Sequence, residues 1–131
     1  HLWSAVVEAV VDEAWLRPLV ECFYDRVRSD ALLGPVFRDA VHDWNDHHSR
    51  LVDFWSSLML ASGRYKGNPV ALHLRHAGSM SAEHFERWLE LWRQASDELL
   101  PRDAAAAVQI KAARVAESLQ LAILYRRPGA I

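Results

Sequence analysis

Apolar residues recur at intervals of three and four along almost the whole chain, and no segment shows the apolar–polar alternation of a half-buried β-strand. The first stripe follows Asp12, a residue type that favours helix N-caps. Its members fall on one face of an α-helix: Leu16, Leu19, Val20, Phe23 and Val27. We therefore predict an all-α fold with four substantial helices and short connecting ones.

Residues that begin or end helices separate the remaining stripes. Asp43, Asn68 and Ser81 are expected N-caps, and Gly63 is expected to end the second long helix with a left-handed cap. Pro18 interrupts the first stripe and indicates a helix start or a kink. The later stripes are Trp44, His47, Leu51, Phe54, Trp55 and Leu58; Phe85, Trp88, Leu89, Trp92 and Leu99; and Val108, Ala112, Val115, Leu119 and Ala122.

Length and charge limit the class of protein. The 131 residues suffice for a single domain, which we expect to span residues 1–131. A formal net charge of −2 gives no attraction to phosphate backbones or anionic membranes, so we expect no nucleic-acid or membrane partner. Cys22 is the single cysteine, which excludes an internal disulfide and multi-cysteine metal sites. A cytoplasmic location is the simplest expectation.

Among the seven histidines, His73 has the most informative position. It lies in the short helix expected after residue 68, with Val70, Leu74 and Ala77 around its face. A histidine on an apolar face needs a hydrogen-bond partner or a ligand role. Position alone favours a core histidine bonded to a backbone carbonyl, and His76, three residues on, is the competing ligand candidate.

Tyr24, His47 and Trp88 are the other polar side chains on apolar stripes. Taken singly, each has a simpler interpretation: a core tyrosine, a first-turn histidine and a packed indole. His48, beside His47, is expected at the surface. No glycine-rich phosphate loop and no Ser–His–Asp or Cys–His arrangement accompanies them. Their joint occurrence is therefore the informative feature.

These residues occur in stretches that resemble the third group of the truncated haemoglobins. The resemblance covers about residues 12–126 and includes His73 as well as Tyr24, His47 and Trp88. The chain also lacks any Gly-Gly pair, as that group does. The matching stretches are FYDRVRSD at 23–30, LGPVF at 33–37, WNDH at 44–47, FW at 54–55, GRYKGNP at 63–69, and the stripe of Phe85, Trp88, Leu89 and Trp92.

The resemblance implies a globin-like two-over-two helical sandwich around one haem. It assigns His73 as the iron ligand and Tyr24, His47 and Trp88 to the distal pocket. Phe37 would pack against the haem plane, and the propionates would find partners among Arg50, Arg64, Tyr65, Lys66 and His76, with Tyr65 and Arg50 first. The expected cofactor-contacting residues are Phe37, Arg50, Leu51, Phe54, Trp55, Tyr65, His73, His76 and Trp88.

The resemblance further implies a protein that binds O2 with high affinity at haem b, along with CO and NO, as a monomer or weak dimer. A haem enzyme, either a nitric oxide dioxygenase or peroxidase-like, is the alternative. That enzyme would need a reductase or another electron source, and no dedicated Arg–His pair is evident in the sequence. A cofactor-free helical interaction module is the third hypothesis, and a Soret band would exclude it.

Overall fold

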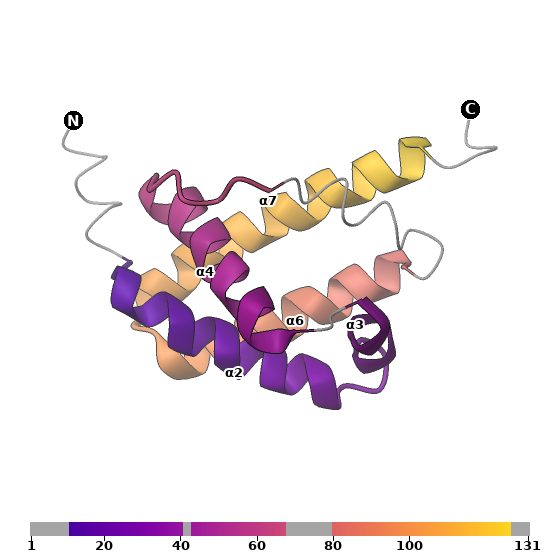
Figure 1. The fold of residues 1–131 in the computed structure, drawn as a ribbon, viewed down its shortest axis with the longest axis horizontal. Helices are drawn as coiled ribbons and strands as arrows, with labels where there is room; N and C mark the ends of the chain where they lie inside the picture. The colour runs from indigo at the N-terminus through magenta and orange to yellow at the C-terminus, as the bar shows by residue number, and fades with distance from the viewer. Residues whose placement is uncertain (1–10, 41–42, 68–79, 127–131) are drawn as a thin grey trace.

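The structure is a computed structural model that describes residues 11–40, 43–67 and 80–126. Every regular element in these ranges is a helix, which confirms the all-α prediction. The short helix predicted after residue 68 lies outside the described residues. The elements are η1 (Glu13–Trp15), α2 (Leu16–Ser29), α3 (Gly34–Ala40), α4 (Trp44–Leu60), α6 (Ala82–Leu99) and α7 (Arg102–Arg126) (Figure 1).

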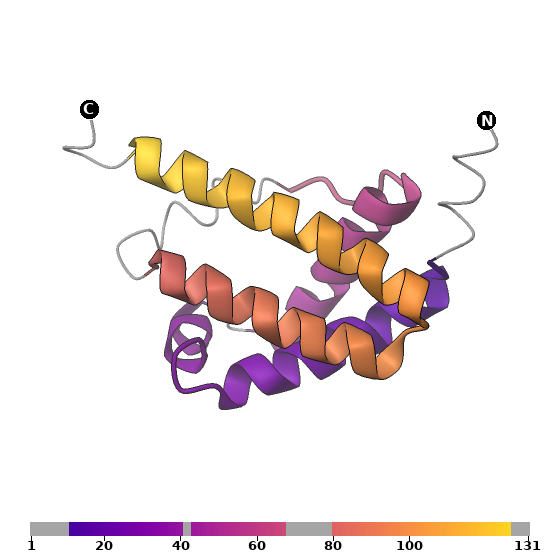
Figure 2. The ribbon, with the colours of Figure 1, turned by 180° about the vertical axis from the view of Figure 1, so that it is seen from behind.

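The four long helices form two layers. In one layer α2 crosses α4, and in the other α6 runs antiparallel to α7 (Figures 1 and 2). The layers meet where α2 packs on α6, and α3 packs against α2. This arrangement confirms the predicted two-over-two sandwich.

The predicted N-caps place the helix starts. The Asp12 carboxylate accepts a hydrogen bond from the Ala14 N–H at 2.9 Å, and the Asp43 carboxylate accepts one from the Asp46 N–H at 3.1 Å. Pro18 lies in the first turn of α2, where its missing N–H would have no helical partner in any case. It therefore marks a helix start rather than a kink.

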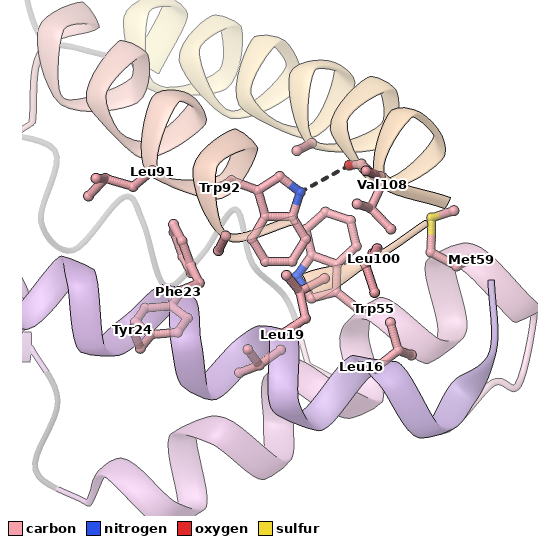
Figure 3. Packing of buried hydrophobic residues seen from close by; sticks show 14 of the residues in the cluster. Leu16, Leu19, Phe23, Tyr24, Trp55, Met59, Leu91, Trp92, Leu100 and Val108 are labelled. Atoms are coloured by element: carbon pink, nitrogen blue, oxygen red, sulfur yellow. Dashed lines mark hydrogen bonds between the residues drawn. The ribbon is translucent and has the colours of Figure 1, made fainter. Parts of the chain in front are cut away.

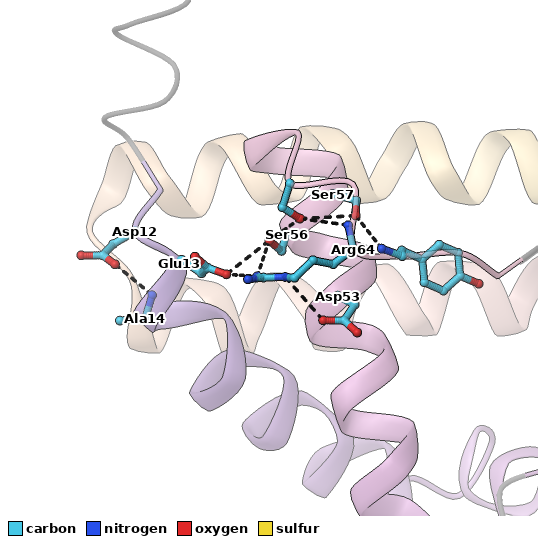
Figure 4. Close-up of polar contacts among 9 residues, drawn as sticks. Asp12, Glu13, Ala14, Asp53, Ser56, Ser57 and Arg64 are labelled. Carbon is cyan, nitrogen blue, oxygen red and sulfur yellow. Dashed lines mark hydrogen bonds and ion pairs between the residues drawn. The ribbon is translucent and has the colours of Figure 1, made fainter.

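The end of α4 differs from the prediction. Ala61, rather than Gly63, is the left-handed C-cap, with φ of 56°, and its N–H donates to the Ser57 carbonyl at 3.1 Å. The hydroxyl of Ser57 accepts the N–H of Tyr65 at 2.9 Å, and Arg64 donates to the Ser56 hydroxyl at 2.6 Å (Figure 4). These polar contacts hold the following loop against α4, and so the helix ends two residues early.

The corner between α2 and α3 is fixed by one buried carboxylate. Asp30 accepts the backbone N–H groups of Leu32 and Leu33 at 3.1 and 3.0 Å, and the guanidinium of Arg87 from α6 at 2.8 Å. A Cβ on Gly34 would lie 2.9 Å from the Arg28 carbonyl, so the chain needs glycine where α3 approaches α2. The corner thus brings α3 and α6 to the same end of α2.

Trp92 lies at the centre of the core, 1% exposed, where α2, α4, α6 and α7 meet (Figure 3). Its indole N–H donates to the Val108 carbonyl at 3.1 Å, and its ring stacks on Trp55 with centroids 4.4 Å apart. The core is therefore close-packed and its central polar atom is hydrogen-bonded. None of the described helices is both long and apolar enough to cross a membrane.

Candidate functional site

Tyr24 is the centre of an aromatic and polar cluster at the α2–α4 crossing. Its side chain is 5% exposed, and its ring lies 5.0 Å from that of His47, 5.5 Å from Phe37 and 5.9 Å from Trp44. Burial raises the pKa of the phenol, and a side-chain hydrogen bond with Trp88 of α6 acts in the opposite direction. The structure therefore brings Tyr24, His47 and Trp88 together from three helices, as the resemblance implies.

His47 is half-buried in this cluster, edge-on to the rings of Tyr24 and Trp44. Its Nε2 atom is buried and has no hydrogen-bond partner among the described residues. Burial, followed by the neighbouring His48 and the charge of Arg50, lowers the pKa of His47 from 6.5 to about 4. His47 is therefore a neutral imidazole at neutral pH, with one nitrogen free to meet a ligand or a water molecule.

His48 corrects a prediction, because it is buried and not at the surface. Only 9% of the residue is exposed, and its ring packs against Tyr24 and Trp44 at 5.9 and 6.0 Å. Its Nε2 atom also lacks a partner within the described residues. Helical spacing could have revealed it, since His48 follows Trp44 by four residues and precedes Trp55 by seven.

Arg28, one turn after Tyr24 on α2, is a second residue that the sequence did not single out. Its guanidinium carbon lies 3.8 Å above the ring centroid of Trp44, a cation–π arrangement. The charge of Arg28 contributes to lowering the pKa of both His47 and His48. The polar end of the cluster therefore combines a cation with two neutral imidazoles.

The apolar residues predicted to contact the haem differ in how deeply they are buried. Phe37, Leu51, Phe54 and Trp88 are half-buried at the edge of the core. Trp55, in contrast, is 2% exposed and lies inside the core against Trp92. A large flat apolar group could cover the first set, while Trp55 would support that wall from behind.

Tyr65 and Arg50 lie near each other at the edge of the apolar wall. The ring of Tyr65 packs edge-on against Phe54 at 5.2 Å, and burial raises the pKa of its phenol while the charge of Arg50 lowers it. The side chain of Arg50 is 65% exposed and pairs with Asp46 one turn earlier. These two residues could therefore bind an anionic group at the rim.

Arg64, another predicted propionate partner, is engaged elsewhere. It pairs with Glu13 and Asp53 and hydrogen-bonds Ser56 at the opposite end of α4 from His47 (Figure 4). Its role in the structure is to join η1, α4 and the following loop. His73 and His76 lie outside the described residues, so their roles stay predictions.

The described residues fit one face of a haem. Half-buried apolar side chains suit a flat apolar disc, and a cation with a phenol suits its anionic edge. Tyr24, Trp88 and the unpartnered nitrogen of His47 form a polar patch beside that wall. A small polar ligand held between the disc and this patch would meet hydrogen-bonding groups from α2, α4 and α6.

Comparisons with known proteins identify the family of this chain. Residues 5–120 match the family described as bacterial-like globin. The group 3 truncated hemoglobin of Campylobacter jejuni is 28% identical over 123 residues, which cover 91% of this chain and 95% of that protein. A crystal structure of the group III truncated hemoglobin from Campylobacter jejuni matches with a TM-score of 0.77, 28% identity and the same coverage. The chain therefore belongs to the bacterial-like globin family, whose members bind haem.

Proposed function

We propose that this protein holds haem b and binds O2 and other diatomic gases beside Tyr24. The observation that supports this best is the buried phenol of Tyr24, which meets Trp88 of α6 and His47 of α4. When one imidazole holds it, haem b supplies an iron with a position open to a gas. CO and NO would use the same pocket.

Tyr24 and Trp88 would hold a polar gas as a coupled pair. The Trp88 N–H donates to the phenol oxygen of Tyr24, which leaves the phenol O–H free to donate to the ligand. A donor that is itself polarised by a hydrogen bond forms a stronger one. Hydrogen bonds to charged groups contribute about 1.5–3 kcal/mol each. We therefore expect slow O2 release and high affinity, which suits oxygen chemistry, sensing or nitric oxide detoxification better than bulk transport.

The rim and walls would position the cofactor. Tyr65 and Arg50 are the proposed propionate partners, and Phe37, Leu51 and Phe54 would pack on the ring. This assignment follows from their half-buried state and from the pairing of a phenol with a cation at the same edge. Replacing Tyr65 or Arg50 should therefore weaken haem retention and leave gas binding beside Tyr24 unchanged.

His73 is the proposed iron ligand. Purified protein should show a Soret band, and replacing His73 with glycine should lose the haem or leave it restorable by added imidazole. His76→Gly is the matched control, because it removes a neighbouring histidine and should leave the spectrum unchanged. An unchanged ferrous spectrum in His73→Gly together with a lost one in His76→Gly would reassign the ligand.

A haem enzyme is the second candidate function, and Arg28 favours it. Its guanidinium lies over the ring of Trp44, which packs edge-on against His47, and its charge contributes to lowering the pKa of His47. An Arg–His pair can take up and return a proton during peroxidase-like turnover. Steady turnover of nitric oxide with a reductase, or of peroxide with a reducing substrate, would separate an enzyme from a reversible gas binder.

A further inference from the structure

Helix α7 turns one side to solvent, on the face of the molecule that Figure 2 views. Its buried stripe, which includes Val108, Ala112 and Leu119, packs into the core. On the opposite side, Ile110 and Leu121 are 56% and 47% exposed, and they are two of the three large apolar side chains exposed in the described part of the chain. We call this side the outer face of α7; its exposed residues are Ala106, Ile110, Ala113, Arg114, Glu117 and Leu121.

The neighbouring helix α6 has a different exposed surface. Between Glu83 and Glu98, every exposed residue of α6 is charged or is a glutamine, as expected for a helix side that faces water. The outer face of α7 instead has a large apolar side chain on either side of a central pair of charges. A face that mixes apolar and charged groups in this way is typical of a surface that binds another protein.

The two central charges, Arg114 and Glu117, form no ion pair with any described residue. Arg17, Arg50 and Arg87, in contrast, each pair with a carboxylate three or four residues away on their own helix. Uncharged residues occupy the positions four residues before and after both Arg114 and Glu117. Both charges are therefore available to a partner outside the chain.

The spacing of the outer face is the same when α7 is followed in either direction. Ile110, Arg114, Glu117 and Leu121 are separated by four, three and four residues. Suppose that a second α7 lies antiparallel on the first, about a two-fold axis between residues 115 and 116. Arg114 then opposes the partner's Glu117, and Ile110 opposes the partner's Leu121, and the symmetry repeats each pair. The outer face is thus complementary to itself in both charge and hydrophobicity.

Other ways of pairing two copies of α7 bring like charges together. A parallel pair opposes Arg114 to its own copy and Glu117 to its own copy. Antiparallel pairs centred on residue 114 or on residue 117, the neighbouring registers, do the same for one of these charges. Opposed like charges disfavour an association, so the charges select the register centred between residues 115 and 116. In that register Ala113 opposes the partner's Ser118, and these small side chains let the two helices approach closely.

We propose that the outer face of α7 joins two copies of this chain in an antiparallel, two-fold dimer. One helix face per subunit buries less than the roughly 1,200 Å² of a standard interface. We therefore expect a dissociation constant on the order of 0.1 mM, so that the protein is a monomer in dilute solution. The contact does not involve the cluster around Tyr24, and the proposal does not depend on the haem assignment.

Sedimentation equilibrium of the purified full chain, below and above this concentration, tests the dimer. Arg114→Glu and Glu117→Arg each replace two attractive pairs by two pairs of like charge, and each should raise the dissociation constant at least about tenfold. The double variant exchanges the two charges and should return the constant to within about threefold of the original. A mixture of the two single variants should also dimerise, because every opposed pair is then attractive.

Two further variants separate the proposed contact from general effects of charge. Arg38→Glu makes the same change in net charge at an exposed position of α3, where no described residue forms an ion pair with Arg38. It should leave the association unchanged. Ile110→Lys places a charge against the partner's Leu121 and should abolish the dimer. Circular dichroism should show the original helix content in all these variants, since each changes an exposed side chain.

The outcomes decide the proposal. A protein that stays monomeric well above the expected concentration would overturn it. A dimer that Arg114→Glu and Glu117→Arg leave intact, or that neither the double variant nor the mixture restores, would also overturn it. Loss of the dimer in each single variant, with recovery in the double variant and in the mixture, would establish the antiparallel contact.

Discussion

The pocket around Tyr24 and the core around Trp92 contain the same kinds of side chain, but they differ in the hydrogen bonding of their buried nitrogen atoms. At the pocket, the ring of His47 lies edge-on to that of Tyr24 with centroids 5.0 Å apart, and in the core Trp92 stacks on Trp55 with centroids 4.4 Å apart. In the core, the Trp92 N–H is bonded to the Val108 carbonyl. At the pocket, the Nε2 atoms of His47 and His48 are buried without a partner among the described residues.

This difference distinguishes a structural region from a binding region. A buried polar atom without a partner costs about 1–3 kcal/mol, so a fold that only needed stability would avoid two of them side by side. In the core, the chain provides a hydrogen-bond acceptor for the buried indole N–H of Trp92. We therefore expect the Nε2 atom of His47 to meet a ligand in the proposed haem pocket.

Truncation of Trp92 in the core should cause the largest loss of stability. Trp92→Ala removes the stacked indole between α2, α4 and α7 and should lower the free energy of unfolding by about 3–5 kcal/mol. Denaturant unfolding measures this, and Trp92→Phe should lose less because it keeps a ring. Leu121→Ala, at an exposed position of α7, is the control and should change little. Equal losses at the two positions would show that Trp92 is not central to the core.

At the pocket, His47→Ala should change kinetics more than stability. We expect His47 to gate the pocket, so its removal should speed CO association several-fold. Because its pKa is about 4, below the ordinary 6.5, His47 stays neutral and inward at neutral pH and becomes charged only as the pH falls toward 4. A charged imidazole favours solvent, so association in the unmodified protein should be constant between pH 8 and pH 6 and faster near pH 4. Flash photolysis measures both, and an unchanged rate in His47→Ala would contradict gating.

The smallest change in the free energy of unfolding is expected at His48, whose Nε2 atom has no hydrogen-bond partner among the described residues. His48→Leu removes an unpartnered polar atom, which should stabilise the fold, but it also removes the ring contacts with Tyr24 and Trp44. The two effects largely cancel, and the free energy of unfolding should fall by no more than about 0.5 kcal/mol. His84→Leu provides the matched comparison, because His84 accepts the Ser81 N–H at 3.1 Å in the capping box of α6. Losing that cap should cost about 1 kcal/mol. A larger loss at His48 than at His84 would show that His48 has a partner after all.

The sequence predicted the helices well because periodicity and caps are local properties. The Asp12, Asp43 and Ser81 caps and the two-over-two arrangement are confirmed. Gly63 was a wrong prediction only as the C-cap of α4. It is left-handed, with φ of 71°, but it lies in the loop two residues after the left-handed Ala61 that ends the helix.

Less of the candidate site than of the fold could be predicted from the sequence alone. Tyr24, Trp88 and His47 were singled out by a family resemblance, and their meeting depends on three helices distant in sequence. Burial of His48 and the position of Arg28 over Trp44 depend on the angle at which α2 crosses α4. Periodicity indicates which face of a helix is buried, but it does not predict which face of another helix it meets.

Dissociation of O2 from Tyr24→Phe tests the central claim most directly. The variant keeps the buried ring and removes only the hydroxyl, so the packing against Phe37 and His47 should persist. A lost hydrogen bond of about 1.5–3 kcal/mol corresponds to roughly a ten- to hundredfold faster release. We predict an O2 dissociation rate at least about tenfold higher, with a far smaller change for the less polar CO. Equal changes for both gases would indicate altered packing or access, and no change for either would show that Tyr24 does not face the ligand.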